Sequence, residues 1–153
     1  MYRIRWIIGV ALLLGLFGSC GISKSLKDRP DLSNYNPQIP EISQTSDTSY
    51  IYSNNSLTKN KQGLWELYVS GDPLQRGFIT GALTEELFHQ QEATFLSKVE
   101  EMVPSKTKRY FLKKFLAWYN RKMYKNIPEE IKVEIWGLSH YASQNFNDIA
   151  DPY

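Results

Sequence analysis

A helix start within residues 70–81 constrains the fold more than any other stretch of this sequence. Gly71 allows a sharp turn at the end of a preceding strand, and Asp72 can accept hydrogen bonds from the free N–H groups of a first helical turn. Pro73 then occupies the first helical position, where its missing N–H costs no hydrogen bond. This order of residues predicts a strand that ends near Ser70 and a helix that begins at Pro73.

Two glycines follow on one face of the same helix, because Gly77 and Gly81 are four residues apart. Each costs roughly 1 kcal/mol relative to alanine in a helix interior. Two of them on one face predict that another backbone packs closely there. Arg76 lies one turn after Asp72, so the sequence also predicts an ion pair between these two side chains. The simplest interpretation is a well-capped helix with a glycine contact face.

The first predicted helix is unusually long. Apolar residues such as Leu74, Phe78 and Phe95 recur near helical spacing over 73–102. At 1.5 Å per residue such a helix is roughly 45 Å long. Pro104 follows it and cannot continue it, which places its end at about Met102.

Two further helices are predicted after this proline. Ser105 can cap a helix over 106–126, and a third helix starts at Pro128. One face of the second helix is apolar and the other is basic. A basic face is most often simply solvated, but it would also fit anionic lipid head groups. Its basic residues are Lys108, Lys113, Lys114, Arg121, Lys122 and Lys125.

Two strand candidates precede the long helix. Residues 49–53 alternate tyrosine with Ile51, and residues 64–69 place Trp65 and two further apolar residues on one face. The asparagines and the glycine of 54–63 supply turn chemistry between them, so we expect an antiparallel hairpin. The predicted fold class is therefore α+β: a short antiparallel hairpin, a long helix and two further helices.

The beginning of the chain reads as an export signal. In residues 1–19, two arginines precede an apolar run of twelve residues, whereas a bilayer-spanning helix needs about 20. Small residues then lead to Cys20, as in a bacterial lipobox, so Cys20 is the predicted lipid attachment site. An ordinary secretory signal that ends near a cysteine is the alternative.

Membrane lipid, bound through Cys20, is accordingly one predicted partner, because several acyl chains anchor a protein durably. Gly21 rather than aspartate follows, so the predicted location is the cell envelope, at the outer membrane of a Gram-negative bacterium. Residues 20–48 are rich in proline and small polar residues and are predicted to be a flexible tether. Residues 49–153 are the predicted folded segment.

The charge balance gives no reason to expect nucleic acid as a partner. The formal net charge is +2, and without Arg3 and Arg5 of the signal the chain has 16 basic and 16 acidic residues. Such a chain has no basic surplus with which to bind phosphates.

No catalytic or metal site stands out. His89 shares a helical face with Glu85 and Glu92, a spacing that could hold a metal but that also arises freely in charged helices. His140 directly follows Ser139, and adjacent helical residues do not face each other, so a hydrolytic triad is not expected. The sequence therefore predicts no metal, no other cofactor and no catalytic residue.

Several short motifs occur together in residues 62–153. With them the chain resembles the N-terminal part of the acyl-CoA:6-aminopenicillanic acid acyltransferase-like family, in the lipoprotein form found in Bacteroidetes. In this resemblance the glycine-rich motif is structural and comprises Gly71, Asp72, Pro73, Arg76, Gly77 and Gly81. The other matching pieces are the strand 63–69, Ile127-Pro128-Glu129-Glu130, Trp136-Gly137-Leu138-Ser139 and Asp151-Pro152-Tyr153.

The resemblance implies an αββα N-terminal nucleophile hydrolase. A precursor of this kind cleaves itself before an internal cysteine, whose free amine then serves as base for its thiol when the thiol attacks an amide carbonyl. This chain has no cysteine after Cys20. We therefore expect it to be the segment upstream of the nucleophile, inactive alone, with a nucleophile-bearing C-terminal chain or segment as its partner.

The alternative is a complete small helical lipoprotein that acts as a non-catalytic binding or structural module. The two hypotheses predict different surfaces. An incomplete piece of a larger fold leaves apolar surface and unpaired strand edges exposed, whereas a self-sufficient module buries its tryptophans and tyrosines.

Overall fold

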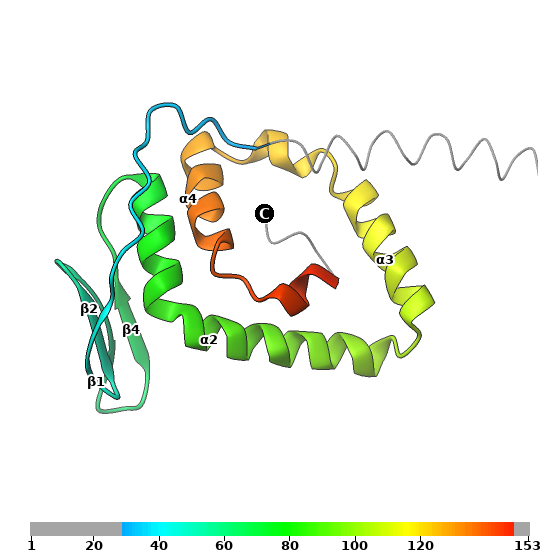
Figure 1. The fold of residues 1–153 in the computed structure, drawn as a ribbon. Helices are drawn as coiled ribbons and strands as arrows, with labels where there is room; N and C mark the ends of the chain where they lie inside the picture. Colours follow the sequence, from blue (N-terminus) through cyan, green and yellow to red (C-terminus); the bar gives the residue numbers. More distant parts are fainter. Residues whose placement is uncertain (1–28, 149–153) are drawn as a thin grey trace, which may run out of the picture.

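The computed structural model describes residues 29–148, which form a four-stranded antiparallel sheet, three α-helices and two short 3-10 helices (Figure 1). The fold class is thus α+β, as the sequence predicts. The signal peptide at 1–19, the lipid site Cys20 and the last motif at 151–153 lie outside the described residues.

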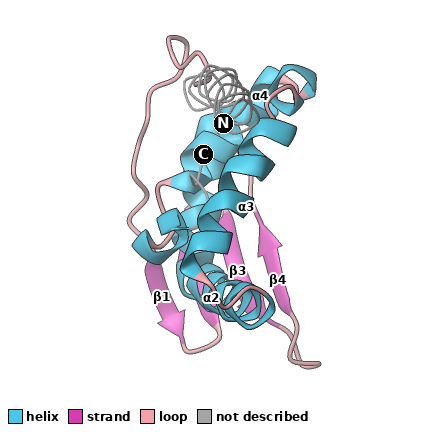
Figure 2. Cartoon of the chain, turned by 90° about the vertical axis from the view of Figure 1, so that its right-hand side faces the viewer, coloured by secondary structure: helices cyan, strands magenta, loops and turns pink. Residues whose placement is uncertain are grey.

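The sheet has the order β1-β2-β3-β4, and its strands are β1 (Ser43–Ser46), β2 (Ser49–Tyr52), β3 (Asn55–Lys59) and β4 (Trp65–Tyr68). The predicted hairpin is wrong in its pairing, because β3 lies between the two strands that the sequence indicates (Figure 2). β3 occupies residues assigned to the turn. Its only large apolar side chain is Leu57, so it shows no alternating pattern. Leu57 is nevertheless buried, opposite Tyr50 on β2 and Leu67 on β4.

The folded part also begins before residue 49. β1 falls in the segment predicted to be a tether, and it pairs with β2. Further upstream, Leu32 and Tyr35 pack against the buried side chains between two helices. Isolated apolar residues in a segment rich in proline and polar residues produce no periodic signal. Residues 20–28 of the predicted tether lie outside the described residues.

The long helix α2 (Pro73–Met102) has the predicted bounds. It bends part-way along its length (Figure 1). Within α2 the hydroxyl of Thr84 donates a hydrogen bond to the carbonyl of Thr80 at 2.7 Å, and bonds of this kind often accompany helix bends. We call residues 73–84 the first limb of α2 and residues 85–102 the second limb.

The hydrophobic core surrounds the first limb. One cluster lies between this limb and the sheet, and another lies between it and α4 (Glu129–Ser139). All the residues that α2 buries belong to the first limb, except Glu92. The first cluster is Leu57, Ile79 and Leu83, and the second is Leu74, Phe78 and Val133.

Helix α3 (Lys106–Tyr119) follows the second limb. The Ser105 side chain accepts a hydrogen bond from the Lys108 N–H at 3.4 Å, as the predicted cap requires. The helix ends at Tyr119 rather than at 126, because the chain turns at Asn120 and then forms η1 (Met123–Asn126). α3 buries none of its side chains and packs extensively against no other helix or strand of residues 29–148. A last 3-10 helix, η2 (Gln144–Asp148), follows α4.

Candidate functional site

The six motif residues singled out in the sequence lie together at the start of α2. Asp72 caps the helix, its carboxylate accepting a hydrogen bond from the Gln75 N–H at 3.0 Å, and Pro73 opens the first turn. Gly71 has a φ of 133°, a conformation that side-chain-bearing residues rarely adopt. The predicted strand-to-helix turn and cap are therefore present, and the sequence chemistry explains them.

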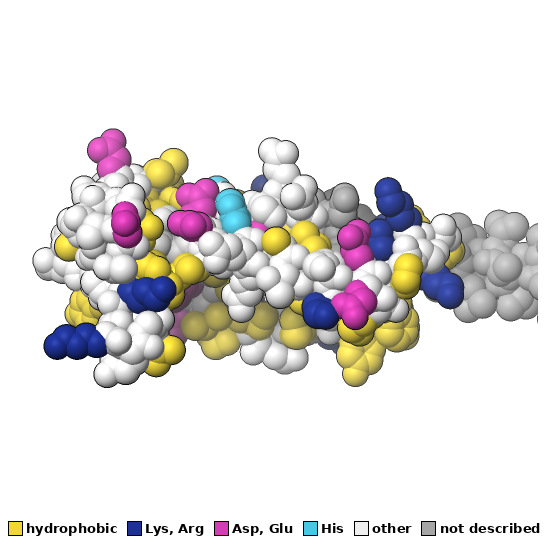
Figure 3. All heavy atoms as spheres, turned by 90° about the horizontal axis from the view of Figure 1, so that it is seen from below, with side chains coloured by type: hydrophobic (Ala, Val, Ile, Leu, Met, Phe, Trp, Pro, Cys, Tyr) yellow, Lys and Arg dark blue, Asp and Glu magenta, His cyan; other side chains and the backbone are white. Residues whose placement is uncertain are grey.

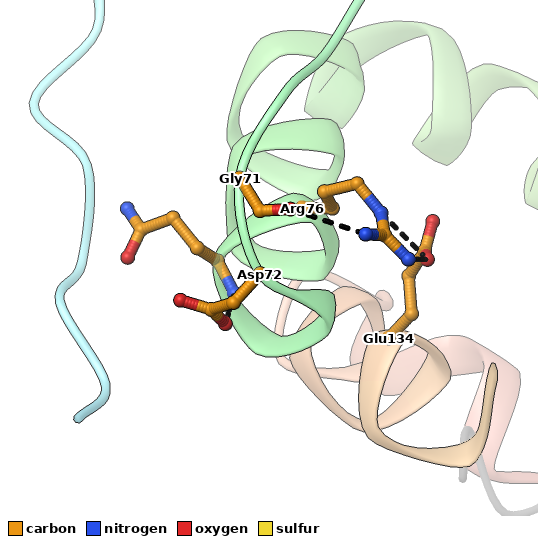
Figure 4. A network of polar contacts seen from close by, with 5 residues as sticks. Gly71, Asp72, Arg76 and Glu134 are labelled. Carbon is orange, nitrogen blue, oxygen red and sulfur yellow. Dashed lines mark hydrogen bonds and ion pairs between the residues drawn. The ribbon is translucent and has the colours of Figure 1, made fainter. Parts of the chain in front are cut away.

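Arg76 makes a different ion pair from the predicted one. Its Nη2 and Nε donate to the carboxylate of Glu134 on α4 at 2.7 and 3.1 Å, and its Nη1 donates to the Gly71 carbonyl at 3.1 Å (Figure 4). The Asp72 carboxylate is directed at the helix N-terminus instead. The predicted Arg76–Asp72 pair is wrong because α4 brings a better-placed carboxylate from 58 residues away.

The glycine face packs against α4 and the segment that follows it. A Cβ on Gly77 would overlap the backbone carbonyl of Glu134 and would lie 3.0 Å from Cα of Gly137. This confirms the prediction of a close backbone at Gly77. At Gly81 the neighbour is instead the aromatic ring of Tyr141. The two helices can cross this closely only because glycine stands on both sides, at 77 and 137.

The segment after α4 is fixed to the second limb by buried polar groups. Nε2 of His89 donates to the Tyr141 carbonyl at 2.8 Å, and the Glu92 carboxylate accepts from the Ser143 N–H at 2.9 Å. Burial, together with the negative charge of Glu85, raises the pKa of the Tyr141 phenol. His89 and Glu92 thus hold the chain in place, and no group of three metal-ligating side chains occurs among residues 29–148.

Glu92 is an unusual member of this contact. Its side chain is only 4% exposed, and one carboxylate oxygen is used by Ser143. The other oxygen, Oε1, is buried and has no hydrogen-bond partner in the part of the chain that the structure describes. A buried acceptor without a donor is costly, so this atom marks a place where a further polar group would be stabilising.

Ser139 and His140 do not form a nucleophile–base pair. The Ser139 hydroxyl donates to the Trp136 carbonyl at 2.7 Å, and Nδ1 of His140 donates to the same oxygen at 2.8 Å. The imidazole also packs against the rings of Phe78 and Trp136. Both side chains therefore hydrogen-bond within the last turn of α4.

Sequence reasoning missed two residues that hold the motif. Buried Asn55 accepts hydrogen bonds from the N–H and hydroxyl of Ser70 at 2.6 and 3.1 Å and donates to the Tyr52 carbonyl. It ties the sheet to the start of α2. Glu134 is the second, as the partner of Arg76. Asn55 looked like a turn residue, and Glu134 gives no local signal, because its role depends on the crossing of two helices distant in sequence.

The contact between the sheet and α2 leaves a pocket next to the motif. A pocket of about 920 Å³ lies between the sheet and α2, lined by Tyr50, Leu57 and Trp65 on the strands and by Glu86 and His89 on the helix. The strands contribute both aromatic rings and the charged Lys59, and the helix contributes carboxylates together with aliphatic side chains. This hollow adjoins the motif without containing any of the six motif residues.

Large apolar side chains are exposed elsewhere. Beside or on β4, Leu64, Leu67 and Tyr68 are 66%, 43% and 62% exposed. Figure 3 shows hydrophobic side chains on the face seen from below, with lysines and arginines beside them at the end farthest from the sheet. Within residues 29–148, more large hydrophobic side chains are exposed than buried.

No family model, curated protein or solved structure matches this chain. Within residues 29–148 no helix combines the length and hydrophobicity needed to cross a bilayer. What the site can do is therefore judged from its own geometry. Its polar groups are used for capping, for the Arg76–Glu134 pair and for fixing the chain after α4, so the motif holds a scaffold together.

Proposed function

We propose that this chain is the membrane-anchored, pre-nucleophile segment of an amide hydrolase or acyltransferase of the N-terminal nucleophile type. Cys20 carries the lipid that holds it in the cell envelope, at the outer membrane. A C-terminal chain or segment supplies the nucleophilic cysteine and the rest of the αββα fold. The chain described here is inactive alone, and its contribution is to support the partner's fold.

The observation that carries this proposal is the unpaired, partly apolar edge of β4, which lies just before the motif at the start of α2. β4 is an edge strand, so one side of its backbone has no strand neighbour among residues 29–148. Leu67 and Tyr68 on this strand are largely exposed. An exposed apolar edge strand readily accepts another strand, and natural proteins rarely leave one uncovered. A sheet that continues past β4 would cover both the backbone edge and these side chains.

Two further features support completion by another segment. The buried Oε1 of Glu92 lacks a donor within residues 29–148, and a partner's N–H or hydroxyl would satisfy it. The motif at Gly71–Gly81, in turn, fixes α2 against both the sheet and α4 through Asn55, Arg76 and Gly77. Such a fixed scaffold presents the edge strand in one orientation.

The test is intact-mass measurement and N-terminal sequencing of every chain that co-purifies with the protein from native membranes. A second chain that begins with an unmodified cysteine is the expected result, together with a diacylglycerol-modified Cys20. A single longer chain that contains this sequence would be an uncleaved precursor and would also support the proposal.

A matched pair of variants connects the mass result to the edge strand. Leu67→Lys places a charge on the exposed helix-side face of β4 and should release the partner. Ile51→Lys places the same charge at a comparably exposed site on central strand β2 and should retain it. Equal retention of the partner by both variants would exclude β4 as the docking edge.

A lone lipidated polypeptide that ends at Tyr153, with no partner, would contradict the hydrolase proposal. It would favour a second candidate, a complete helical lipoprotein that binds without chemistry. The observation in favour of that candidate is the continuous packing of α2, α4 and the sheet around two buried clusters. These clusters give the chain a core of its own.

A further inference from the structure

The solvent-facing side of α3 is strongly apolar. Its only half-buried side chains, Arg109, Lys113 and Ala117, recur every four residues and form one stripe. From residue 111 on, the rest of its surface carries aromatic and aliphatic residues whose exposures run from 38% for Leu112 to 69% for Tyr119. In chain order these residues are Phe111, Leu112, Phe115, Leu116, Trp118 and Tyr119.

The same segment carries charge of one sign only. Between residues 106 and 126 there are eight lysines and arginines and no aspartate or glutamate. Arg109 pairs with Glu100 at 3.2 Å, and Arg121 stacks over the Trp118 ring at 4.5 Å. Lys108 is exposed and lies three and four residues before Phe111 and Leu112, at the N-terminal end of the apolar side. Lys114 is also exposed and borders this side, three residues after Phe111.

We propose that α3 lies flat on an anionic lipid bilayer, with its apolar side in the acyl boundary and its lysines at the phosphates. A helix with Trp, Phe and Leu on one side and only basic charge around it is the usual form of an interfacial helix. Trp118 and Tyr119 have the amphipathic rings that favour the head-group level. Exclusively positive flanks match an anionic surface by charge.

Other occupants fit less well. A nucleic acid would use the lysines but would leave the apolar residues in water. A protein groove would cover the apolar residues, but its rim would also have to supply acidic side chains for Lys108 and Lys114. A phosphate-rich membrane surface satisfies both sets at once. In the described structure α3 forms the side of the molecule turned to the viewer in Figure 2, so it can reach a flat surface.

This inference does not depend on the hydrolase proposal, because it uses only the described surface of α3. The experiment uses the full chain with Cys20→Ala, which removes its one thiol, reconstituted into vesicles. A new cysteine at Phe115 carries an environment-sensitive NBD fluorophore. A second protein carries the fluorophore at Thr45, an exposed residue of β1 far from α3. Tyr119→Cys provides another site on the apolar side if the label at 115 disturbs the helix.

The expected result is a blue shift and increased emission at 115 in phosphatidylglycerol vesicles but not in phosphatidylcholine vesicles. The probe at 45 should not change. Replacing Lys108 and Lys114 by glutamine should lower the equilibrium constant for α3 contact about 30-fold, since each lysine near an anionic surface contributes about 1 kcal/mol. The matched control, Lys59→Gln with Lys61→Gln, removes the same charge near the sheet and should have no effect.

Three outcomes would overturn the proposal. One is an NBD emission at 115 or 119 that shows no blue shift with either kind of vesicle. Another is an equal blue shift on both kinds, which would remove the role of anionic lipid. The third is protection of the probe only after a protein binds, which would assign this face to a protein partner.

Discussion

Two regions of this molecule use amphipathic helices in opposite ways. In the packed unit, formed by the sheet, the first limb of α2 and α4, apolar side chains of each element meet in two buried clusters, although Ile131 and Ile135 of α4 stay exposed. In the outer frame, formed by the second limb, α3 and η1, comparable stripes face solvent. An apolar stripe therefore indicates which side of a helix needs cover, but it does not indicate what covers it.

The largest expected effect tests whether the packed unit and the outer frame differ in how much their apolar side chains contribute to stability. Leu74→Ala removes a side chain that is 1% exposed and should lower the free energy of unfolding by about 2–5 kcal/mol. Phe115→Ala in α3 should change it by less than about 0.5 kcal/mol. Urea unfolding of the full chain measures both. A loss at Phe115 similar to that at Leu74 would show that α3 is packed.

Gly77→Ala tests the helix crossing itself. Alanine favours a helix by roughly 1 kcal/mol over glycine, but the added Cβ would overlap the Glu134 carbonyl. We expect a net loss of about 1–3 kcal/mol in the free energy of unfolding. Gly81→Ala is the comparison, because its Cβ would meet the side chain of Tyr141 rather than a backbone and should cost less. A stabilised Gly77→Ala protein would mean that α2 and α4 do not cross as described.

The ion pairs of the two regions should differ by a smaller amount. Arg76→Lys keeps the charge but loses the planar guanidinium that donates to both Glu134 and the Gly71 carbonyl. We expect this variant to lower the free energy of unfolding by about 0.5–1 kcal/mol. Lys98→Gln breaks the largely exposed pair with Glu101 on the second limb and should cost almost nothing. Chemical denaturation of both variants checks the difference, and equal costs would remove the special role of Arg76.

The smallest effect concerns alkaline pH. Burial raises the pKa of Tyr141, so the folded chain holds this proton more tightly than the unfolded chain does. The resulting stability is complete below pH 10 and is lost as the pH rises through the raised value. Tyr141→Phe should therefore flatten the fall of stability above pH 10. Parallel pH curves for the two proteins, recorded by denaturation, would contradict this assignment.

The sequence predicts local chemistry well and distant pairing poorly. The Asp72 cap, Pro73, the Ser105 cap and the bounds of α2 all follow from neighbouring residues, and the structure confirms them. β3 escaped prediction because Leu57 is its only buried apolar side chain. The true partner of Arg76 escaped because Glu134 comes near it only after α4 has packed.

In the candidate site, too, the features set by neighbouring residues could be predicted and those set by distant contacts could not. The position of Gly77 predicts a close backbone, and the structure confirms one. The roles of Asn55 and Glu92 could not be predicted, since a polar residue in a turn or a charged helix looks solvated until the tertiary contacts are known. The exposure of the apolar side chains on β4 and α3 could not be predicted either, because it depends on which elements pack together.

The bend in α2 directs the second limb, and α3 after it, away from the sheet (Figure 1). The first limb is held between the sheet and α4, and His89 and Glu92 tie the start of the second limb to the chain after α4. Residues 93–102 then extend about 15 Å past these two contacts, at 1.5 Å per residue. A rotation of about 10° at Glu92 would move the far end of α2, and α3 with it, by about 3 Å. A displacement of that size at α3 would therefore reach the packed unit only as a small change of angle at one helical turn.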